Sequence, residues 1–371
     1  GASNFPLAFS TAGGDTASAL AAGCPVVVKA HPAHPGTSEL VAGAIVAAAQ
    51  KTSMPEGVFS MLFDAGHETG SALTTHPLTR AVAFTGSQKG GMALYRLAQQ
   101  RPEPIPVFAE MGSVNPVILF PEALQTRTTA IATQLATSVT LGVGQFCTNP
   151  GLILAMETPG FDELLQSLGS AIQEAVPGVM LSAGILENFS ASAEERLSEH
   201  GVETVGKTQK LATEYQAAPA IAKVSATRFL KNPRLHEEVF GPFSLVVACA
   251  DAGELAQVIQ ALPGQLTGTL MAEPAELGRY VTLIQLLQNK VGRLIFNGVP
   301  TGVEVGHAMQ HGGPFPATTD ARFTSVGTAA IRRFVRPVAY QDFPDTWLPD
   351  ALKRDNPLNI WRLVNGAWTK S

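Results

Sequence analysis

The chain has 371 residues, of which 45% are hydrophobic and 15% charged, and a formal net charge of −5. That length favours about two or three domains with sizeable cores. The acidic balance argues against a general nucleic-acid binder, which needs a basic surface to neutralise phosphates. No apolar run is long enough to span a bilayer, and no signal peptide opens the chain. We therefore expect no nucleic-acid or membrane partner and a cytoplasmic location, which the three widely spaced cysteines also suit.

In the first part of the chain, short β-branched runs alternate with turns and with helical patterns. We expect strands over residues 25–29, 58–62, 81–84 and 106–110. We expect helices over residues 37–50, 66–73 and 92–99. Such alternation of strand and helix is typical of a doubly wound parallel sheet.

Two strand ends in this region carry features that suit a dinucleotide. Thr85, Gly86 and Ser87 form a turn between a strand and a helix, where backbone N–H groups can bind a pyrophosphate. An ordinary helix N-cap at Ser87 is the alternative, and no GxGxxG motif is present. Lys29 ends another strand and can reach a cofactor ribose or phosphate, or can simply be a solvated lysine.

A third strand ends in Glu110, directly before Met111 and Gly112. A carboxylate that is partly desolvated at such a position has a raised pKa and can act as a base. The alternative is a glutamate that caps a helix or forms a salt bridge.

The second part of the chain continues the alternation, but less regularly. We expect strands over residues 115–119, 152–155, 245–248 and 292–297, with an edge strand over 331–340 that suits pairing between subunits. We expect helices over residues 161–175 and 252–262. The polar region 182–216 suits a solvated helix face and is assigned no chemistry. The spacing of the histidines favours loop or core positions rather than a metal site: His31, His34, His307 and His311.

One cysteine stands out because of its surroundings. Cys147 lies between a glycine-rich approach and a Pro-Gly exit, after the long apolar, Thr- and Ala-rich segment 124–141. A lone thiol of this kind, with a carboxylate elsewhere in the chain, is a candidate nucleophile. The alternative is a small buried hydrophobe, since free cysteines are usually buried and inert.

Seven short motifs, taken in order, resemble those of the aldehyde dehydrogenase superfamily from residue 1 to nearly the end of the chain. They are Ser3-Asn4-Phe5-Pro6, Val28-Lys29, Phe84-Thr85-Gly86-Ser87, Glu110-Met111-Gly112, Gly144-Gln145-Phe146-Cys147, Glu238-Val239-Phe240-Gly241-Pro242 and Pro314-Phe315. Each is weak alone, but seven in the right order are strong. Members of the family carry a long segment before the first motif, so we expect this chain to be N-terminally truncated.

The resemblance implies a role for each matching residue. It implies that Cys147 is the nucleophile, that Glu110 is the general base and that Asn4 donates its amide to the oxyanion. For the cofactor it implies contacts from Lys29, Gly86, Ser87, Glu238 and Phe240. For the substrate tunnel it implies Phe146 and Phe315. The implied reaction is NAD(P)-dependent oxidation of an aldehyde to an acid through a thiohemiacetal and a thioester.

A narrower resemblance concerns the substrate. Residues 30–36, 147–151 and 356–366 look like those of bacterial 2,5-dioxopentanoate (α-ketoglutarate semialdehyde) dehydrogenases, which imply 2-oxoglutarate as product. A long-chain fatty aldehyde dehydrogenase is the alternative enzyme, and a truncated non-catalytic remnant that only self-associates is the alternative of another class. A carboxylated substrate calls for a basic or amide-rich end to the tunnel, and the sequence does not single out that group.

Cofactor choice and architecture complete the expectations. Relatives specific for NAD often place an acid three residues after the lysine, where this chain has Pro32, so we expect NADP rather than NAD. We predict an α/β fold of the aldehyde-dehydrogenase type that forms a homodimer or homotetramer. Its parts are a Rossmann-type cofactor domain (1–111), an α/β catalytic domain (112–327), a bridging strand arm for oligomerisation (328–345) and a C-terminal tail (346–371).

Overall fold

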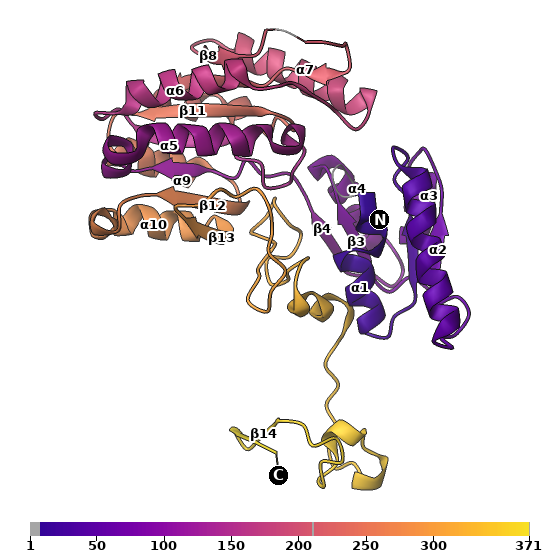
Figure 1. Cartoon of the computed structure of the whole chain (residues 1–371). Helices are drawn as coiled ribbons and strands as arrows, with labels where there is room; N and C mark the ends of the chain where they lie inside the picture. The colour runs from indigo at the N-terminus through magenta and orange to yellow at the C-terminus, as the bar shows by residue number, and fades with distance from the viewer. Residues whose placement is uncertain (1–7, 210, 371) are drawn as a thin grey trace. The chain divides into compact units, whose positions relative to one another are not determined.

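The computed structural model describes residues 8–209 and 211–370 (Figure 1). The chain forms two compact units, Gly1–Phe334 and Val335–Ser371. In the second unit, β14 (Arg362–Val364) and β15 (Ala367–Thr369) pair as an antiparallel hairpin after two short 3-10 helices, η6 (Asp345–Trp347) and η7 (Asp350–Leu352). Within the described ranges, no helix is both long and apolar enough to cross a bilayer.

The first unit begins with two separate pairs of parallel strands. They are β1 (Val26–Lys29) with β2 (Phe59–Leu62), and β3 (Val82–Thr85) with β4 (Val107–Glu110). The helices of this region are η1 (Ala8–Ala12), α1 (Gly14–Ala21), α2 (Pro35–Lys51), α3 (Glu68–Thr75) and α4 (Gln88–Gln99). All seven strands and helices expected before residue 112 are present. Helix α4 begins four residues earlier than expected, because the Ser87 hydroxyl caps it by accepting a hydrogen bond from the Gly90 N–H.

The larger sheet of this unit has seven strands in the order β13-β12-β5-β6-β11-β10-β8, parallel except for β8 at one edge. The strands are β5 (Val117–Leu119), β6 (Leu152–Met156), β8 (Glu203–Lys207), β10 (Ala220–Ser225), β11 (Phe243–Cys249), β12 (Gln265–Met271) and β13 (Val291–Phe296). A short pair, β7 (Gly178–Val179) and β9 (Gln216–Ala217), lies outside this sheet.

Helices cover both faces of the larger sheet, so its central strands are buried on both sides. One apolar core joins the sheet to α5 (Pro121–Thr140) and α6 (Phe161–Glu174). The other joins it to α7 (Ala183–Ser198), α8 (Ala226–Lys231), α9 (Ala252–Ala261) and α10 (Val281–Gln288). Short 3-10 helices complete the unit: η2 (Leu141–Gly144), η3 (Pro233–His236), η4 (Pro274–Tyr280) and η5 (Thr328–Phe334).

The sequence did not predict β8, β10, β12 or α10. In β12, every residue is buried, but two threonines, a glycine and a glutamine interrupt the apolar run. Burial on both faces removes the alternation that identifies a half-buried strand. The seven-stranded sheet lies wholly within residues 112–327, but both sheet regions belong to the first unit, so the boundary at residue 111 remains a prediction.

The expected bridging strand over residues 331–340 is wrong for the described chain. Thr328–Phe334 forms the 3-10 helix η5, and residues 335–340 have no regular secondary structure. The helix directs the buried guanidinium of Arg333 to Asp15, 2.6 Å away, and its Nε to the Ala330 carbonyl. Since burying a guanidinium is costly unless it is paired, this ion pair outweighs the β-branched character of the segment.

A left-handed turn leads from α5 towards the segment that holds Cys147. Gly142, Val143 and Gly144 have φ values of +56°, +59° and +64°. A Cβ atom added to Gly144 would lie 2.2 Å from the carbonyl carbon of Gly241. The backbones of the two segments therefore touch, which only glycine permits at this φ.

We expect Gly144→Ala to destabilise the fold by about 1–3 kcal/mol, because the methyl group must displace backbone at a positive φ. Gly184→Ala is the matched control, since its added Cβ meets nothing within 4 Å on helix α7. The control should leave stability unchanged or raise it slightly. Urea unfolding of both variants measures the difference in their free energies of unfolding. Equal midpoints would show that the close contact between the segments at Gly144 and Gly241 does not limit stability.

Candidate active site

Asn115 fixes the backbone on both sides of Cys147. Its side-chain amide donates to the carbonyls of Cys147 and Asn149, each at 2.9 Å. Its carbonyl oxygen accepts from the Ser113 hydroxyl at 2.9 Å and from the Thr267 hydroxyl at 3.0 Å. Asn115 is fully buried and has a φ of +46°, a conformation that asparagine tolerates better than most residues. The cysteine segment is thereby tied to strands β5 and β12.

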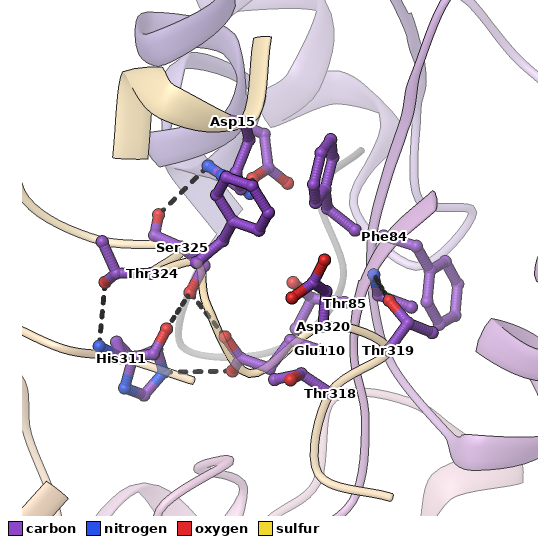
Figure 2. A pocket seen from close by; sticks show the side chains of 14 residues that line it. Asp15, Phe84, Thr85, Glu110, His311, Thr318, Thr319, Asp320, Thr324 and Ser325 are labelled. Atoms are coloured by element: carbon purple, nitrogen blue, oxygen red, sulfur yellow. Dashed lines mark hydrogen bonds and ion pairs between the residues drawn. The ribbon is translucent and has the colours of Figure 1, made fainter. Parts of the chain in front are cut away.

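Glu110 ends strand β4 and points into a buried site (Figure 2). The side chain is 6% exposed, and its Oε2 accepts a 2.6 Å hydrogen bond from the Ser325 hydroxyl. Burial raises the pKa of Glu110, but the neighbouring His311 and the hydrogen bonds from His311, Ser325 and Cys147 together bring it below the usual value. Glu110 is therefore ionised at neutral pH. A cavity of about 20 Å³ beside it has room for roughly one water.

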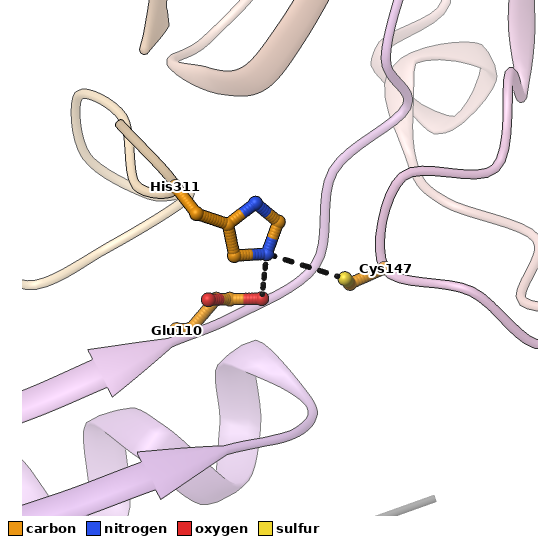
Figure 3. A group of neighbouring side chains, drawn as sticks. All are labelled: Glu110, Cys147 and His311. Carbon is orange, nitrogen blue, oxygen red and sulfur yellow. Dashed lines mark hydrogen bonds and ion pairs between the residues drawn. The ribbon is translucent and has the colours of Figure 1, made fainter. Parts of the chain in front are cut away.

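Three reactive side chains meet at the carboxyl end of β4 (Figure 3). His311 Nε2 lies 3.0 Å from Glu110 Oε1 and 3.5 Å from Cys147 Sγ. They come from three separate segments: the end of a strand, the loop after η2 and the loop that follows β13. A thiol, an imidazole and a carboxylate in contact are the elements of a nucleophile with an adjacent base.

His311 is the site residue that the sequence interpretation missed. Its spacing from the other histidines predicts a loop or core position without chemistry, and the side chain is buried, at 4% exposure. Because Glu110 is ionised, it needs a hydrogen-bond donor, so we place a proton on His311 Nε2. His311 Nε2 then cannot accept the proton of the Cys147 thiol, and Glu110 is the base for that thiol. Glu110, Cys147 and His311 offer ligand atoms within 4.8 Å of one another, so the expectation of no metal site remains a prediction.

The thiol of Cys147 is held in its protonated form. Burial is the largest cause of a pKa well above the usual value, followed by the negative charge of Glu110 and its hydrogen bond, and then by the charge of Glu238. A protonated thiol beside an ionised carboxylate is the starting point for proton transfer at the moment of attack. The structure brings Cys147 and Glu110 together, and their roles as nucleophile and general base remain predictions.

Other predicted site residues stand apart from this cluster. Phe146 packs over Gly142, where an added Cβ would lie 2.6 Å from its ring. Phe315 is 59% exposed, so the described chain does not enclose it in a tunnel. Asn4 lies outside the described residues, and its role as oxyanion donor remains a prediction.

The residues expected to hold the cofactor have suitable chemistry. Lys29 Nζ donates to the Asp64 carbonyl at 2.8 Å, beside a pocket of about 190 Å³. Ser87 caps α4, whose free N–H groups suit a phosphate; a Cβ on Gly86 would lie 2.6 Å from the Phe84 ring. The residues thus offer a cation and free N–H groups that suit an anionic dinucleotide.

Glu238 and Phe240 follow the cysteine segment in the sequence, whereas the other expected cofactor residues precede it. Both side chains are partly buried. Burial raises the pKa of Glu238 to about 7, against the effect of a hydrogen bond from the Ser113 backbone. A Cβ on Gly112 would lie 2.4 Å from Glu238 Oε2, so the carboxylate rests against bare backbone. A carboxylate in this position can accept a hydrogen bond from a ribose hydroxyl.

The reactivity of Cys147 gives a direct test of its electrostatics. We expect alkylation by iodoacetamide to be slow at pH 7 and to accelerate up to and beyond pH 9, because the raised pKa keeps the thiolate fraction small. Glu110→Gln should shift the profile to lower pH, since it removes the nearest negative charge. Peptide mass spectrometry, with Cys147→Ser as control, separates this thiol from Cys24 and Cys249. An unshifted profile in Glu110→Gln would contradict the proposed coupling.

Comparison with known proteins is consistent with this geometry. Alpha-ketoglutaric semialdehyde dehydrogenase 2 of Azospirillum brasilense is 55% identical over 366 residues, 99% of this chain and 70% of the relative. The alpha-ketoglutaric semialdehyde dehydrogenase of Acinetobacter baylyi is 50% identical over 372 residues, 100% of this chain and 70% of the relative.

Solved structures share the predicted α/β fold. Gamma-glutamyl-gamma-aminobutyraldehyde dehydrogenase of Burkholderia cenocepacia matches with a TM-score of 0.73 at 22% identity, over 87% of this chain and 63% of that one. A mutant 1-pyrroline-5-carboxylate dehydrogenase of Thermus thermophilus matches with a TM-score of 0.73 at 23% identity, over 89% and 62%. The aldehyde dehydrogenase family model matches residues 2–315. The predicted family and fold are thus confirmed, and the chain belongs to the aldehyde dehydrogenase family.

Proposed function

We propose that this chain oxidises α-ketoglutarate semialdehyde to 2-oxoglutarate. The observation that carries the proposal is the combination of the Cys147–Glu110 pair with 55% identity, along nearly the whole chain, to a dehydrogenase named for that substrate. Membership of the family implies NAD(P) as cofactor. A long-chain aldehyde is the alternative substrate, and a chain that only self-associates is the alternative without catalysis.

The chain's own residues account for the chemistry at the substrate. As Cys147 Sγ forms a bond to the aldehyde carbon, its proton passes to the Glu110 carboxylate. The aldehyde oxygen becomes an oxyanion, for which Asn4 is the proposed donor, and each such donor contributes about 3–4 kcal/mol in other enzymes. Bound NAD(P) supplies the acceptor for the hydride that leaves the same carbon.

The second half of the reaction releases the acid. Glu110 first releases the proton of the thiol to solvent, because only its ionised form can act as a base again. The substrate is then a thioester on Cys147. Glu110 removes a proton from an attacking water and passes it to the sulfur as the carbon–sulfur bond breaks, which restores the thiol. His311 holds Glu110 by its 3.0 Å contact, and Ser325 holds the other carboxylate oxygen at 2.6 Å. The base is therefore fixed at both oxygens.

NADP is the cofactor that we propose, because Pro32 places no acid at the position that repels a 2′-phosphate in NAD-specific relatives. Burial, His34 and Lys29 lower the pKa of His31 to about 4, so His31 is neutral and adds no cation for that phosphate. Asp64 lines the same pocket, and its negative charge reduces the preference for NADP over NAD. Lys29 is thus the cation on which NADP binding depends.

We expect a Cys147-dependent formation of reduced cofactor with α-ketoglutarate semialdehyde, faster with NADP than with NAD and faster than with decanal. Cys147→Ala should lose essentially all of this rate, since Cys147 carries the only thiol that the described residues place beside Glu110. Absorbance at 340 nm measures the four substrate–cofactor pairs. A preference for decanal would replace the proposed substrate, and a preference for NAD would replace the proposed cofactor. No rate with any pair would favour the non-catalytic alternative.

We also propose that the chain forms a homodimer or homotetramer. Large apolar side chains are exposed throughout the second unit, among them Trp347 at 79%, Trp361 at 63% and Trp368 at 69%. Exposed apolar surface of this extent is typical of a surface that another chain covers. Light scattering after size exclusion should give twice or four times the mass of 38.9 kDa. A monomer whose mass does not change between the wild type and Trp361→Ser/Trp368→Ser would contradict this proposal.

A further inference from the structure

Arg293 is a partly buried cation without an acidic partner. It lies on strand β13, and none of the ion pairs formed among the described residues includes it. Two other arginines are paired: Arg333 with Asp15 at 2.6 Å, and Arg127 with Glu273 at 2.7 Å. The buried Arg101 has no acidic partner in the described chain either, and its terminal nitrogens donate to the carbonyls of Thr74 and Pro77. Arg293 differs from Arg101 in having a buried Nε without a hydrogen-bond partner, and an unsatisfied buried charge of this kind is suited to an anion that binds from outside.

The register of the sheet places Arg293 on the side of the cysteine segment. Arg293 is the β13 partner of Thr267 on β12, so the two side chains share a face of the sheet. The Thr267 hydroxyl donates to Asn115, whose amide donates to the Cys147 carbonyl. The preceding residue, Gly292, touches the backbone of Gly312, next to His311. Arg293 is thus connected to both Cys147 and His311 through short chains of contacts.

The guanidinium is held in a fixed orientation but is not neutralised. Its terminal nitrogens donate to the carbonyls of Pro300 at 3.0 Å and Gly302 at 3.4 Å. The hydroxyl of Thr301, between them, contacts the Ser138 hydroxyl on α5. The Arg293 Nε is buried and has no hydrogen-bond partner. A fixed planar guanidinium with a free donor is suited to a carboxylate.

Arg293 and Cys147 also interact electrostatically. Burial lowers the pKa of Arg293, and the Cys147 thiolate is the charge that raises it. The two groups are therefore within range of each other in a poorly screened site.

We propose that Arg293 binds the carboxylate at the far end of the substrate, so that Cys147 and Arg293 together select aldehydes that carry an acidic end. This inference rests on the proposed function for the identity of the preferred substrate. It supplies the basic group that the sequence alone did not single out. The test distinguishes this role from two others: Arg293 as a clamp for residues 300–302 only, and Arg293 as a stabiliser of the thiolate.

The test compares two aldehydes of equal length, α-ketoglutarate semialdehyde and pentanal, in four forms of the full chain. The forms are wild type, Arg293→Gln, Arg293→Lys and the control Arg127→Gln, which removes another partly buried arginine. We expect Arg293→Gln to lower kcat/KM for the semialdehyde by ~30-fold or more and that for pentanal by less than about threefold. Arg293→Lys should recover part of the loss. Arg127→Gln should affect both substrates equally.

Equal losses for both aldehydes in Arg293→Gln would make Arg293 a clamp or a thiolate stabiliser and overturn the proposal, and so would no loss for either. If the wild type prefers another aldehyde to the semialdehyde, the proposed function fails separately. In that case the proposal about Arg293 is tested with a shorter pair of aldehydes. It stands only if kcat/KM of the wild type is higher for succinate semialdehyde than for butanal and Arg293→Gln removes this difference.

A second measurement needs neither cofactor nor turnover. Glutarate should protect Cys147 of the wild type from iodoacetamide, and butyrate at the same concentration should protect it less, because it lacks the second carboxylate. The protection by glutarate should disappear in Arg293→Gln and persist in Arg127→Gln. Protection that survives in Arg293→Gln would overturn the proposal, even for a chain that shows no activity.

Discussion

The site depends on one constraint: the carboxylate of Glu110 must stay ionised although it is almost completely buried. Burial raises the pKa of Glu110 and so favours its protonated form, which could accept a proton neither from the thiol nor from water. The contacts of His311 and Ser325, at 3.0 and 2.6 Å, reverse that effect. The same negative charge raises the pKa of Cys147, so the base and the nucleophile each set the protonation state of the other.

Around this pair, distant parts of the chain are joined by close contacts that restrict how far their backbones can move. Asn115 ties the cysteine segment to β12 through Thr267, and Gly144 lets that segment lie directly on the backbone at Gly241. Gly292 does the same for the backbone at Gly312, beside His311. Such close approaches position reacting groups within fractions of an ångström, which is the accuracy that proximity effects require.

The sequence predicted those parts of the fold and site whose signals are local. The strand that ends in Glu110 and the glycine-rich approach to Cys147 are contiguous motifs, and both are where the interpretation placed them. His311 is 164 residues from Cys147, in a loop without periodicity, so nothing local connects the two. Strand β12 was missed because burial on both faces removes its alternation, and the strand over 331–340 was wrong because a distant partner, Asp15, fixes Arg333 in a 3-10 helix.

Charge balance links the catalytic pair to the choice of substrate. Glu110 and Glu238 both contribute negative potential at Cys147, which opposes a thiolate and would also repel an acidic substrate. The guanidinium of Arg293, which has no acidic partner among the described residues, offsets that potential. A carboxylated aldehyde can then enter a site whose base is anionic, because its own negative charge is bound before its aldehyde carbon meets the thiol. An aldehyde without an acidic end gains nothing from Arg293, so the cation discriminates between substrates while the chemistry at Cys147 stays the same.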